Sequence, residues 1–274
     1  ISPEIKYAGF DAIIIQGIAS EPVYLFIDDF NIEIRPATEL WGKGALETEA
    51  LLKQDVGDEF QIATIGPAGE NKVLFACISH DFGRQAGRTG IGAVMGSKNL
   101  KAIAVHGTKA VPLADPVATL EKGKEMFRAC FEKPGFEEWT PQGTAGVTDW
   151  VNEVGAFPTH NFKTGYFPKH KDINGEALMT KIKVTDKACY SCPIPCGKYS
   201  RVKKAEYDIH VEGPEYETIA LIGGNTEIDN IEDCAYANYI LDELGLDSIS
   251  GGNVVGFAME CFEKGIIKSE DIGG

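Results

Sequence analysis

Three closely spaced cysteines constrain this chain more than any other feature. Cys189, Cys192 and Cys196 have the spacing C-x2-C-x3-C, and two prolines stiffen the backbone between the last two. Thiols this close together can converge on one small metal centre, either a structural zinc site or an iron–sulfur cluster, and both normally take four protein ligands. We therefore expect the segment to fold around a metal, with the fourth ligand supplied from elsewhere.

The source of the fourth ligand has two interpretations. The remaining cysteines are scattered singly, as is usual for small buried residues of a reduced interior, and one of them is recruited in the first interpretation: Cys77, Cys130, Cys234 or Cys261. In the second, which we favour, the ligand lies beyond Gly274. The sequence opens close to a strand-like segment and closes straight after a helical pattern, so we expect both ends to be cut.

Composition excludes several classes of partner. The chain has 274 residues, a net charge of −15 and an isoelectric point near 4.8, so nucleic acid and anionic membranes would repel it. No stretch reaches the roughly 18 consecutive apolar residues that a membrane span needs, and we expect no membrane insertion. Seven cysteines, an odd number with one tight cluster, predict metal ligation in a reducing compartment, by default the cytoplasm.

Hydrophobic patterning predicts an α+β fold with a boundary near residue 110. Residues 1–108 are expected to be β-rich, with one helix at 44–54 and strands at 12–15, 23–27, 31–35, 61–65, 73–78 and 102–105. The second and third of these strands flank a turn and predict a hairpin. Residues 109–274 are expected to be mostly helical, with helices at 116–131, 217–221, 231–244 and 253–265.

A glycine-rich stretch, residues 84–99, combines flexible backbone with three cations. Its glycines would let backbone N–H groups approach an anion, and Arg84, Arg88 and Lys98 could supply charge to a phosphate. The spacing matches neither a Walker A loop nor the dinucleotide fingerprint. A tight turn between strands explains the stretch equally well, and both interpretations stay open at this point.

Two further segments carry acidic residues. Residues 206–218 hold five carboxylates and His210. Such a run is usually a solvated helix start, but its position close after the cysteines favours proton transfer in a buried site. Residues 242–247, Asp-Glu-Leu-Gly-Leu-Asp, are typical of a helix C-terminus with Gly245 as the cap.

The order of these segments resembles one family. The loop ends in Ala-Gly-Arg-Thr-Gly-x-Gly-Ala-Val-Met-Gly-Ser-Lys-Asn-Leu-Lys-Ala, and Cys-x2-Cys-Pro-x2-Cys, Glu-Gly-Pro-Glu-Tyr-Glu-Thr and Asp-x2-Gly-Leu-Asp follow it. Together they resemble the aldehyde:ferredoxin oxidoreductases, tungsten or molybdenum enzymes with a bis-pterin cofactor, over residues 7–267. The resemblance implies that residues 1–108 are the second half of a β-sheet pterin-binding domain and 109–274 most of a helical domain, with a third domain and the catalytic histidine missing.

The resemblance also implies roles for individual residues. Three cysteines would ligate a four-iron four-sulfur cluster, and Glu217, with Glu215 and Glu212 as rivals, would be the active-site glutamate. The glycine loop would hold the pterin phosphates and a bridging magnesium, through Arg84, Gln85, Ala86, Gly87, Arg88 and Gly90. The first of two pterin-binding motifs would comprise Asp242, Gly245, Leu246 and Asp247.

The implied activity is oxidation of an aldehyde to a carboxylic acid, with electrons passing through the cluster to ferredoxin or to electron-transfer subunits of a homo- or hetero-oligomer. One alternative is the catalytic subunit of a tungsten-dependent benzoyl-CoA reductase; the Glu-Gly-Pro-Glu-Tyr-Glu segment favours the aldehyde-oxidising branch. Another is a non-catalytic zinc protein whose ligands are the three cysteines and His210. The zinc-protein interpretation leaves the glycine-rich stretch unexplained.

Overall fold

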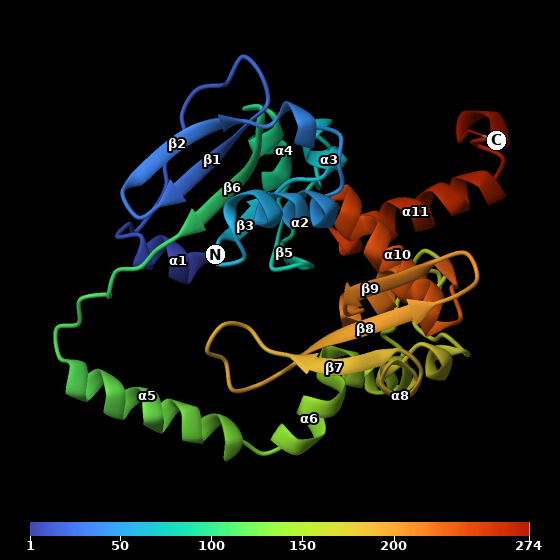
Figure 1. Ribbon diagram of the computed structural model, residues 1–274. Coiled ribbons are helices and arrows are strands. Elements are labelled where there is room, and N and C mark those ends of the chain that lie inside the picture. Colours follow the sequence, from blue (N-terminus) through green and yellow to red (C-terminus); the bar gives the residue numbers. More distant parts are fainter. Residues whose placement is uncertain (274) are drawn as a thin grey trace. The chain divides into compact units, whose positions relative to one another are not determined.

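The computed structural model describes residues 1–273, which divide into two units (Figure 1). Unit 1 comprises Ile1–Thr119 with Ile240–Asp247, and unit 2 comprises Leu120–Tyr239 with the residues from Ser248 onward. The division therefore falls inside helix α10 (Ile231–Leu244), whose last turn belongs to unit 1. Within the described residues, no helix has both the length and the apolar character to cross a membrane.

Unit 1 is built on a mixed six-stranded sheet with the order β2-β1-β6-β3-β4-β5. Strands β1 and β2 form the expected antiparallel hairpin, β1 runs parallel to β6, and β6 pairs antiparallel with β3. The strands are β1 (Val23–Asp28), β2 (Asn31–Pro36), β3 (Gln61–Thr64), β4 (Ile78–His80), β5 (Arg84–Ala86) and β6 (Leu100–His106). The remaining elements are α1 (Ser2–Tyr7), η1 (Thr38–Leu40), α2 (Ala45–Val56), α3 (Pro67–Glu70) and α4 (Ile91–Gly96).

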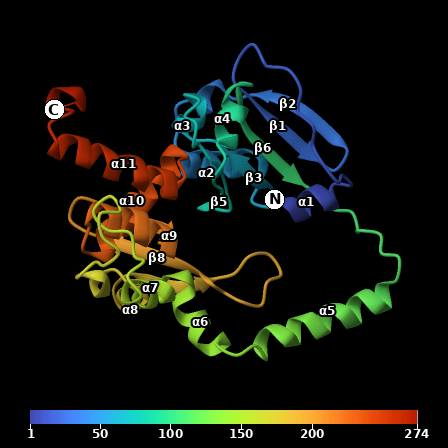
Figure 2. The same ribbon diagram turned by 180° about the vertical axis from the view of Figure 1, so that it is seen from behind.

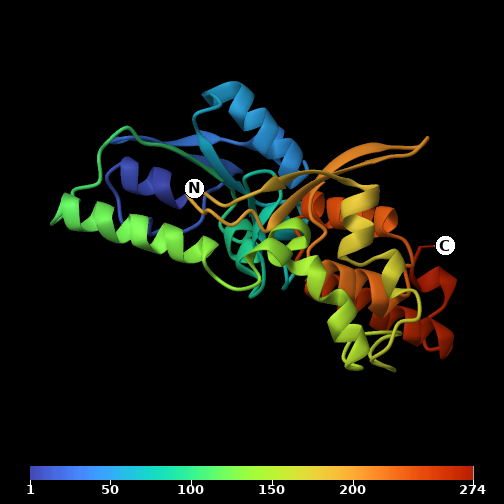
Figure 3. The ribbon, with the colours of Figure 1, turned by 90° about the horizontal axis from the view of Figure 1, so that it is seen from below.

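Helices cover both faces of this sheet because its central strands are apolar on both faces (Figure 3). On one face, Leu52 of α2 packs against Phe26 and Ala104. On the other face, Met95 of α4 packs against Leu100, and α1 contributes Ile5 beside Ile27. Alternate residues of β1 thus enter different hydrophobic clusters, as the period of a strand requires.

Unit 2 contains several helices (Figure 2) and a three-stranded antiparallel sheet in the order β7-β8-β9 (Figure 1). Its core joins Val202, Ile209 and Val211 of the sheet to Leu178 of α8 and Ala235 of α10. The strands are β7 (Lys183–Lys187), β8 (Gly197–Lys203) and β9 (Asp208–Glu212). The helices are α6 (Phe136–Gln142), α7 (Thr148–Glu153), α8 (Gly175–Lys181), α9 (Tyr216–Thr218) and α11 (Ser248–Glu263), with α5 (Pro116–Phe131) crossing the division. The short turns are η2 (Gly143–Val147), η3 (His170–Asp172), the π-helical η4 (Ile219–Gly223), η5 (Gly224–Thr226) and η6 (Ser269–Asp271).

The α+β class is confirmed, with four corrections. Residues 12–15 form no strand but an irregular segment, and residues 73–78 form a turn from which only Ile78 enters a strand. The glycine-rich stretch is not a simple turn between strands, because it contains β5 and α4. The region expected to be mostly helical also carries β7, β8 and β9.

Candidate functional site

The glycine loop and the Asp-x2-Gly-Leu-Asp motif lie side by side in unit 1, although about 150 residues separate them. Gln85 donates from Nε2 to Asp242 Oδ1 at 2.8 Å, and Arg88 Nε lies 3.8 Å from Asp247 Oδ2. We call residues 84–92 and 242–247 together the loop–motif site.

Backbone pairing fixes the register of the motif. Leu246 forms an antiparallel bridge with Ala76, Cys77 N–H donates to the Gly245 carbonyl at 2.9 Å, and Asp247 N–H donates to the Phe75 carbonyl at 3.2 Å. Residues 73–78 are therefore partly extended, as their composition predicts, but their partner is the motif and not a neighbouring strand. The loop is joined to the same segment, because Gly92 N–H donates to the Ala76 carbonyl at 3.0 Å.

Glycine is required where the motif turns. Gly245 ends α10 with φ at +72°, the left-handed conformation expected of a C-cap glycine. A Cβ on Gly66 would fall 2.4 Å from the carbonyl carbon and oxygen of Leu244, so these two backbones are in direct contact. The end of α10 thus rests on the turn that follows β3.

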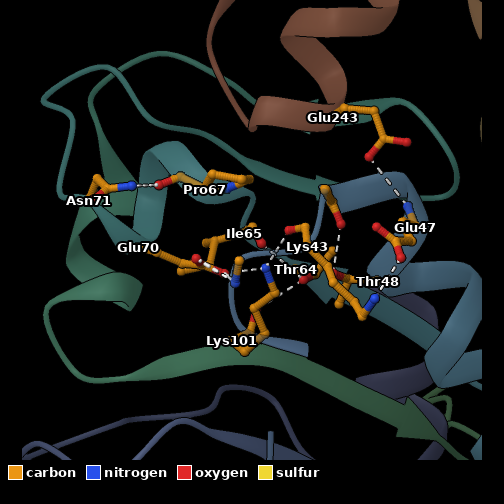
Figure 4. A network of polar contacts seen from close by, with 12 residues as sticks. Lys43, Glu47, Thr48, Thr64, Ile65, Pro67, Glu70, Asn71, Lys101 and Glu243 are labelled. Carbon is orange, nitrogen blue, oxygen red and sulfur yellow. Dashed lines mark hydrogen bonds and ion pairs between the residues drawn. The ribbon is translucent and has the colours of Figure 1, made fainter. Parts of the chain in front are cut away.

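A buried ion pair supports that turn (Figure 4). Lys101 of β6 is fully buried, pairs with Glu70, and donates to the Lys43 carbonyl at 2.9 Å. Glu70 in turn accepts from Gly42 N–H at 2.8 and 3.0 Å. The pair holds residues 42–44 beside the turn at 66–70. The Glu243 side chain packs against Gly44 and accepts weakly from Glu47 N–H at 3.4 Å.

The two aspartates of the motif are buried at the C-terminal end of a helix, where the helix dipole opposes negative charge. They therefore need donors, which the loop supplies in part. Burial raises the pKa of the adjacent Cys77 thiol to about 12, and the Asp242 and Asp247 carboxylates add to this effect. A thiol held protonated is a poor metal ligand. Burial also raises the pKa of Cys234 to about 12, so both thiols are protonated in the absence of a metal.

The three clustered cysteines occupy the connection between β7 and β8 in unit 2. Cys192 N–H donates to the Cys189 carbonyl at 3.0 Å, which makes a turn, and Cys196 directly precedes β8. Cys189 and Cys192 are exposed and Cys196 is half-buried. Among the described residues, no three His, Cys, Asp or Glu side chains are gathered closely enough to hold a metal. Three thiols on one short connection are nonetheless the donor chemistry that an iron–sulfur cluster takes, so the residues fit that group chemically.

The acidic segment adjoins the cysteine connection through the sheet. Glu212 of β9 pairs with Tyr199 of β8, and its buried carboxylate lies 2.8 Å from Lys187 Nζ at the end of β7. Gly213 N–H donates to the Lys198 carbonyl at 2.7 Å. The chain therefore places Glu212 and Cys196 at the same end of one small sheet.

Glu215 and Glu217 differ in their surroundings. Glu215 is half-buried, and its carboxylate accepts from Thr144 Oγ, which itself accepts from Tyr216 N–H at 2.9 Å. Glu217 is exposed, so the residues that the structure describes do not form the buried site that we expected around its carboxylate. The neighbour of Thr144, Gly143, packs against the Cys196 carbonyl, and η2 thus links the acidic segment to the third cysteine.

His210 lies apart from the cysteines. It pairs with Arg201 on β8, five residues along from Cys196, which corresponds to about 16 Å at the rise of a strand. Its ring stacks on Tyr199 with centroids 5.4 Å apart. That separation argues against the zinc site of three cysteines and His210.

The fold and these segments define a class, and the chain belongs to the aldehyde ferredoxin oxidoreductase family. Residues 1–107 match the family's N-terminal domain, and residues 121–274 match the part described as domains 2 & 3.

Among its relatives are tungsten-containing aldehyde ferredoxin oxidoreductases. That of Pyrococcus furiosus is 47% identical over 98% of this chain, and that of Pyrococcus horikoshii is 46% identical over 99%; in both cases the chain spans 44% of the relative's length. A solved structure, the active site complex BamBC of benzoyl coenzyme A reductase with 1,5-dienoyl-CoA, matches with a TM-score of 0.82 and 31% identity. That match covers 100% of this chain and 43% of the solved one.

Proposed function

We propose that the protein oxidises an aldehyde to the carboxylic acid at a tungsten or molybdenum bis-pterin centre. Electrons would leave through a four-iron four-sulfur cluster to ferredoxin or a partner subunit, in a reducing cytoplasm. The observation that carries this proposal is the loop–motif site, where Arg88 faces Asp247 and Gln85 faces Asp242. Relatives named for this activity support it.

The chemistry of the side chains suits a pterin. Buried carboxylates accept hydrogen bonds from ring N–H groups, while Arg84, Arg88 and the loop N–H groups suit phosphate oxygens, and the loop carbonyl oxygens suit a bridging magnesium. When bound, the metal and its dithiolene sulfurs supply the two-electron chemistry. The chain's own tasks would be to orient the cofactor through the loop–motif site and to move a proton through Glu217 or Glu215.

Arg88 provides the first test. Its side chain is 64% exposed while Asp247 is only 7% exposed, so the guanidinium can reach a ligand without losing its contact to the motif. Arg88→Ala is expected to lower pterin and tungsten content per chain in protein produced anaerobically with tungstate. Arg128→Ala, at an exposed position of α5, is the matched control. Equal cofactor content in both variants would remove Arg88 from the site.

A second candidate function has one specific observation in its favour, the 31% identity to a benzoyl-CoA reductase active-site complex. Two assays separate the candidates. Aldehyde-dependent reduction of ferredoxin, with a viologen dye as a second acceptor, supports our proposal. Turnover of 1,5-dienoyl-CoA with the dye, without aldehyde oxidation, would replace it with the reductase.

A further inference from the structure

One lysine of unit 2 is buried against the cysteine connection. Lys198 is 2% exposed, and it lies on β8 two positions after Cys196. Its ammonium donates to three backbone carbonyls and faces one carboxylate: Thr140 O at 2.7 Å, Pro195 O at 2.7 Å, Gly197 O at 3.3 Å and Asp186 Oδ1 at 3.1 Å. A buried ammonium needs such partners, because it has lost its hydration.

Two of these acceptors flank Cys196. Pro195 and Gly197 are its neighbours in sequence, so the ammonium holds the backbone on both sides of the third cysteine. Gly143 packs against the backbone of Cys196 itself, since a Cβ at that position would fall 2.1 Å from the Cys196 carbonyl oxygen. The backbone of Cys196 is therefore fixed before any ligand binds to its sulfur.

Two lysines beside the cysteine connection share one carboxylate. Asp186 is shared between Lys198 and Lys183, whose Nζ lies 2.7 Å from the same Oδ1. One carboxylate thus serves two ammonium groups. The other nearby pair, Lys187 with Glu212, is neutral as a unit. The Lys198 ammonium is therefore only partly offset by its one carboxylate partner, in a buried setting beside Cys196 where solvent screens it weakly.

We propose that Lys198 is a positioning residue for the iron–sulfur cluster, which fixes Cys196 and raises the cluster's reduction potential. The inference rests on the proposed function, in which Cys196 is a cluster ligand. Reduction adds one negative charge to the cluster, and a nearby fixed positive charge stabilises that reduced state. Net charge and hydrogen bonding are the means by which proteins tune such potentials.

Three variants test the inference. Lys198→Met removes the charge and the carbonyl contacts, and its cluster is expected to have a more negative midpoint potential or lower iron content than wild type. Asp186→Asn removes the shared carboxylate and keeps Lys198, so its potential is expected to shift in the positive direction. Lys183→Met is the control for the positioning role, because Lys183 shares Asp186 but donates to Pro141 and not to the carbonyls beside Cys196; it removes a nearby positive charge, so its potential is expected to shift in the negative direction with full iron content.

The readouts are iron and acid-labile sulfide per chain, and a redox titration of the reduced cluster by electron paramagnetic resonance. Loss of iron in Lys198→Met, with Lys183→Met fully loaded, supports the positioning role. If Lys198→Met does not fold, the positive shift in Asp186→Asn still tests the charge. Iron contents and potentials that equal wild type in both Lys198→Met and Asp186→Asn overturn the inference. A wild-type protein without iron and sulfide contradicts the proposed cluster instead.

Discussion

Removing the Lys101 ammonium should destabilise unit 1 far more than removing a surface lysine next to it. Lys101 is fully buried, and the Glu70 side chain is only 5% exposed. Lys101→Met would leave that carboxylate buried without its countercharge, and breaking such a pair costs about 3–5 kcal/mol. Glu70 would keep its two hydrogen bonds from Gly42 N–H, so we expect the lower end, about 3 kcal/mol.

Native-state hydrogen exchange of the β6 amides measures this cost. A loss of about 3 kcal/mol corresponds to exchange that is roughly 100-fold faster, since each 1.4 kcal/mol is a factor of ten. Lys43→Met is the control, because Lys43 forms only a surface ion pair with Glu47, for which about 0.3–0.5 kcal/mol is expected. Lys101→Met combined with Glu70→Gln should recover most of the loss, because the amide still accepts from Gly42. Exchange accelerated less than tenfold by Lys101→Met would refute this reasoning.

Three further predictions follow from single contacts. Gly66→Ala places a Cβ 2.4 Å from the Leu244 carbonyl, so thermal unfolding should show a loss of about 1–3 kcal/mol, whereas Gly123→Ala, with nothing within 4 Å, should not destabilise. The hydrogen bond to Glu227 raises the pKa of His160, so its stabilising effect is full below pH about 6.5 and is lost as pH rises through the raised pKa. The difference in urea midpoint between wild type and His160→Gln should therefore be larger at acidic pH; an equal difference at alkaline pH would contradict this. If Glu217 moves the proton, Glu217→Gln should slow aldehyde turnover by about 10²–10⁴ with cofactor content unchanged, while Glu212→Gln and Glu215→Gln serve as internal comparisons. If Glu215→Gln turns over slowly and Glu217→Gln turns over normally, Glu215 and not Glu217 is the proton-transfer residue.

Local patterns predicted the regular elements of this chain well. The hairpin of β1 and β2, helix α5 and helix α10 all lie where composition and periodicity indicated. Residues 73–78 show that local patterns do not predict the pairing partner of an extended segment. They have the composition of a strand, but Ala76 bridges to Leu246, and no local signal reveals a partner about 170 residues away.

The sequence motifs predicted which segments form the candidate site, but not which side chains in and around it are buried. The loop and the Asp242–Asp247 motif were singled out from the sequence, and the structure brings them together. Lys101 and Lys198 were missed, because lysine is usually exposed and burial depends on carbonyls supplied by distant turns. The exposure of Glu217 was missed for the same reason, since a cluster of acids does not show which member faces inward.

Metal analysis of the wild-type protein and of Cys192→Ala tests the account most directly. The protein is produced anaerobically with tungstate, and tungsten, iron, acid-labile sulfide and released pterin are measured per chain. We predict tungsten and pterin in both proteins, and iron with sulfide in the wild type only, because the cysteines lie in unit 2 and the loop–motif site in unit 1. Full iron content in Cys192→Ala, or wild-type protein that contains zinc in place of tungsten and iron, would contradict the account.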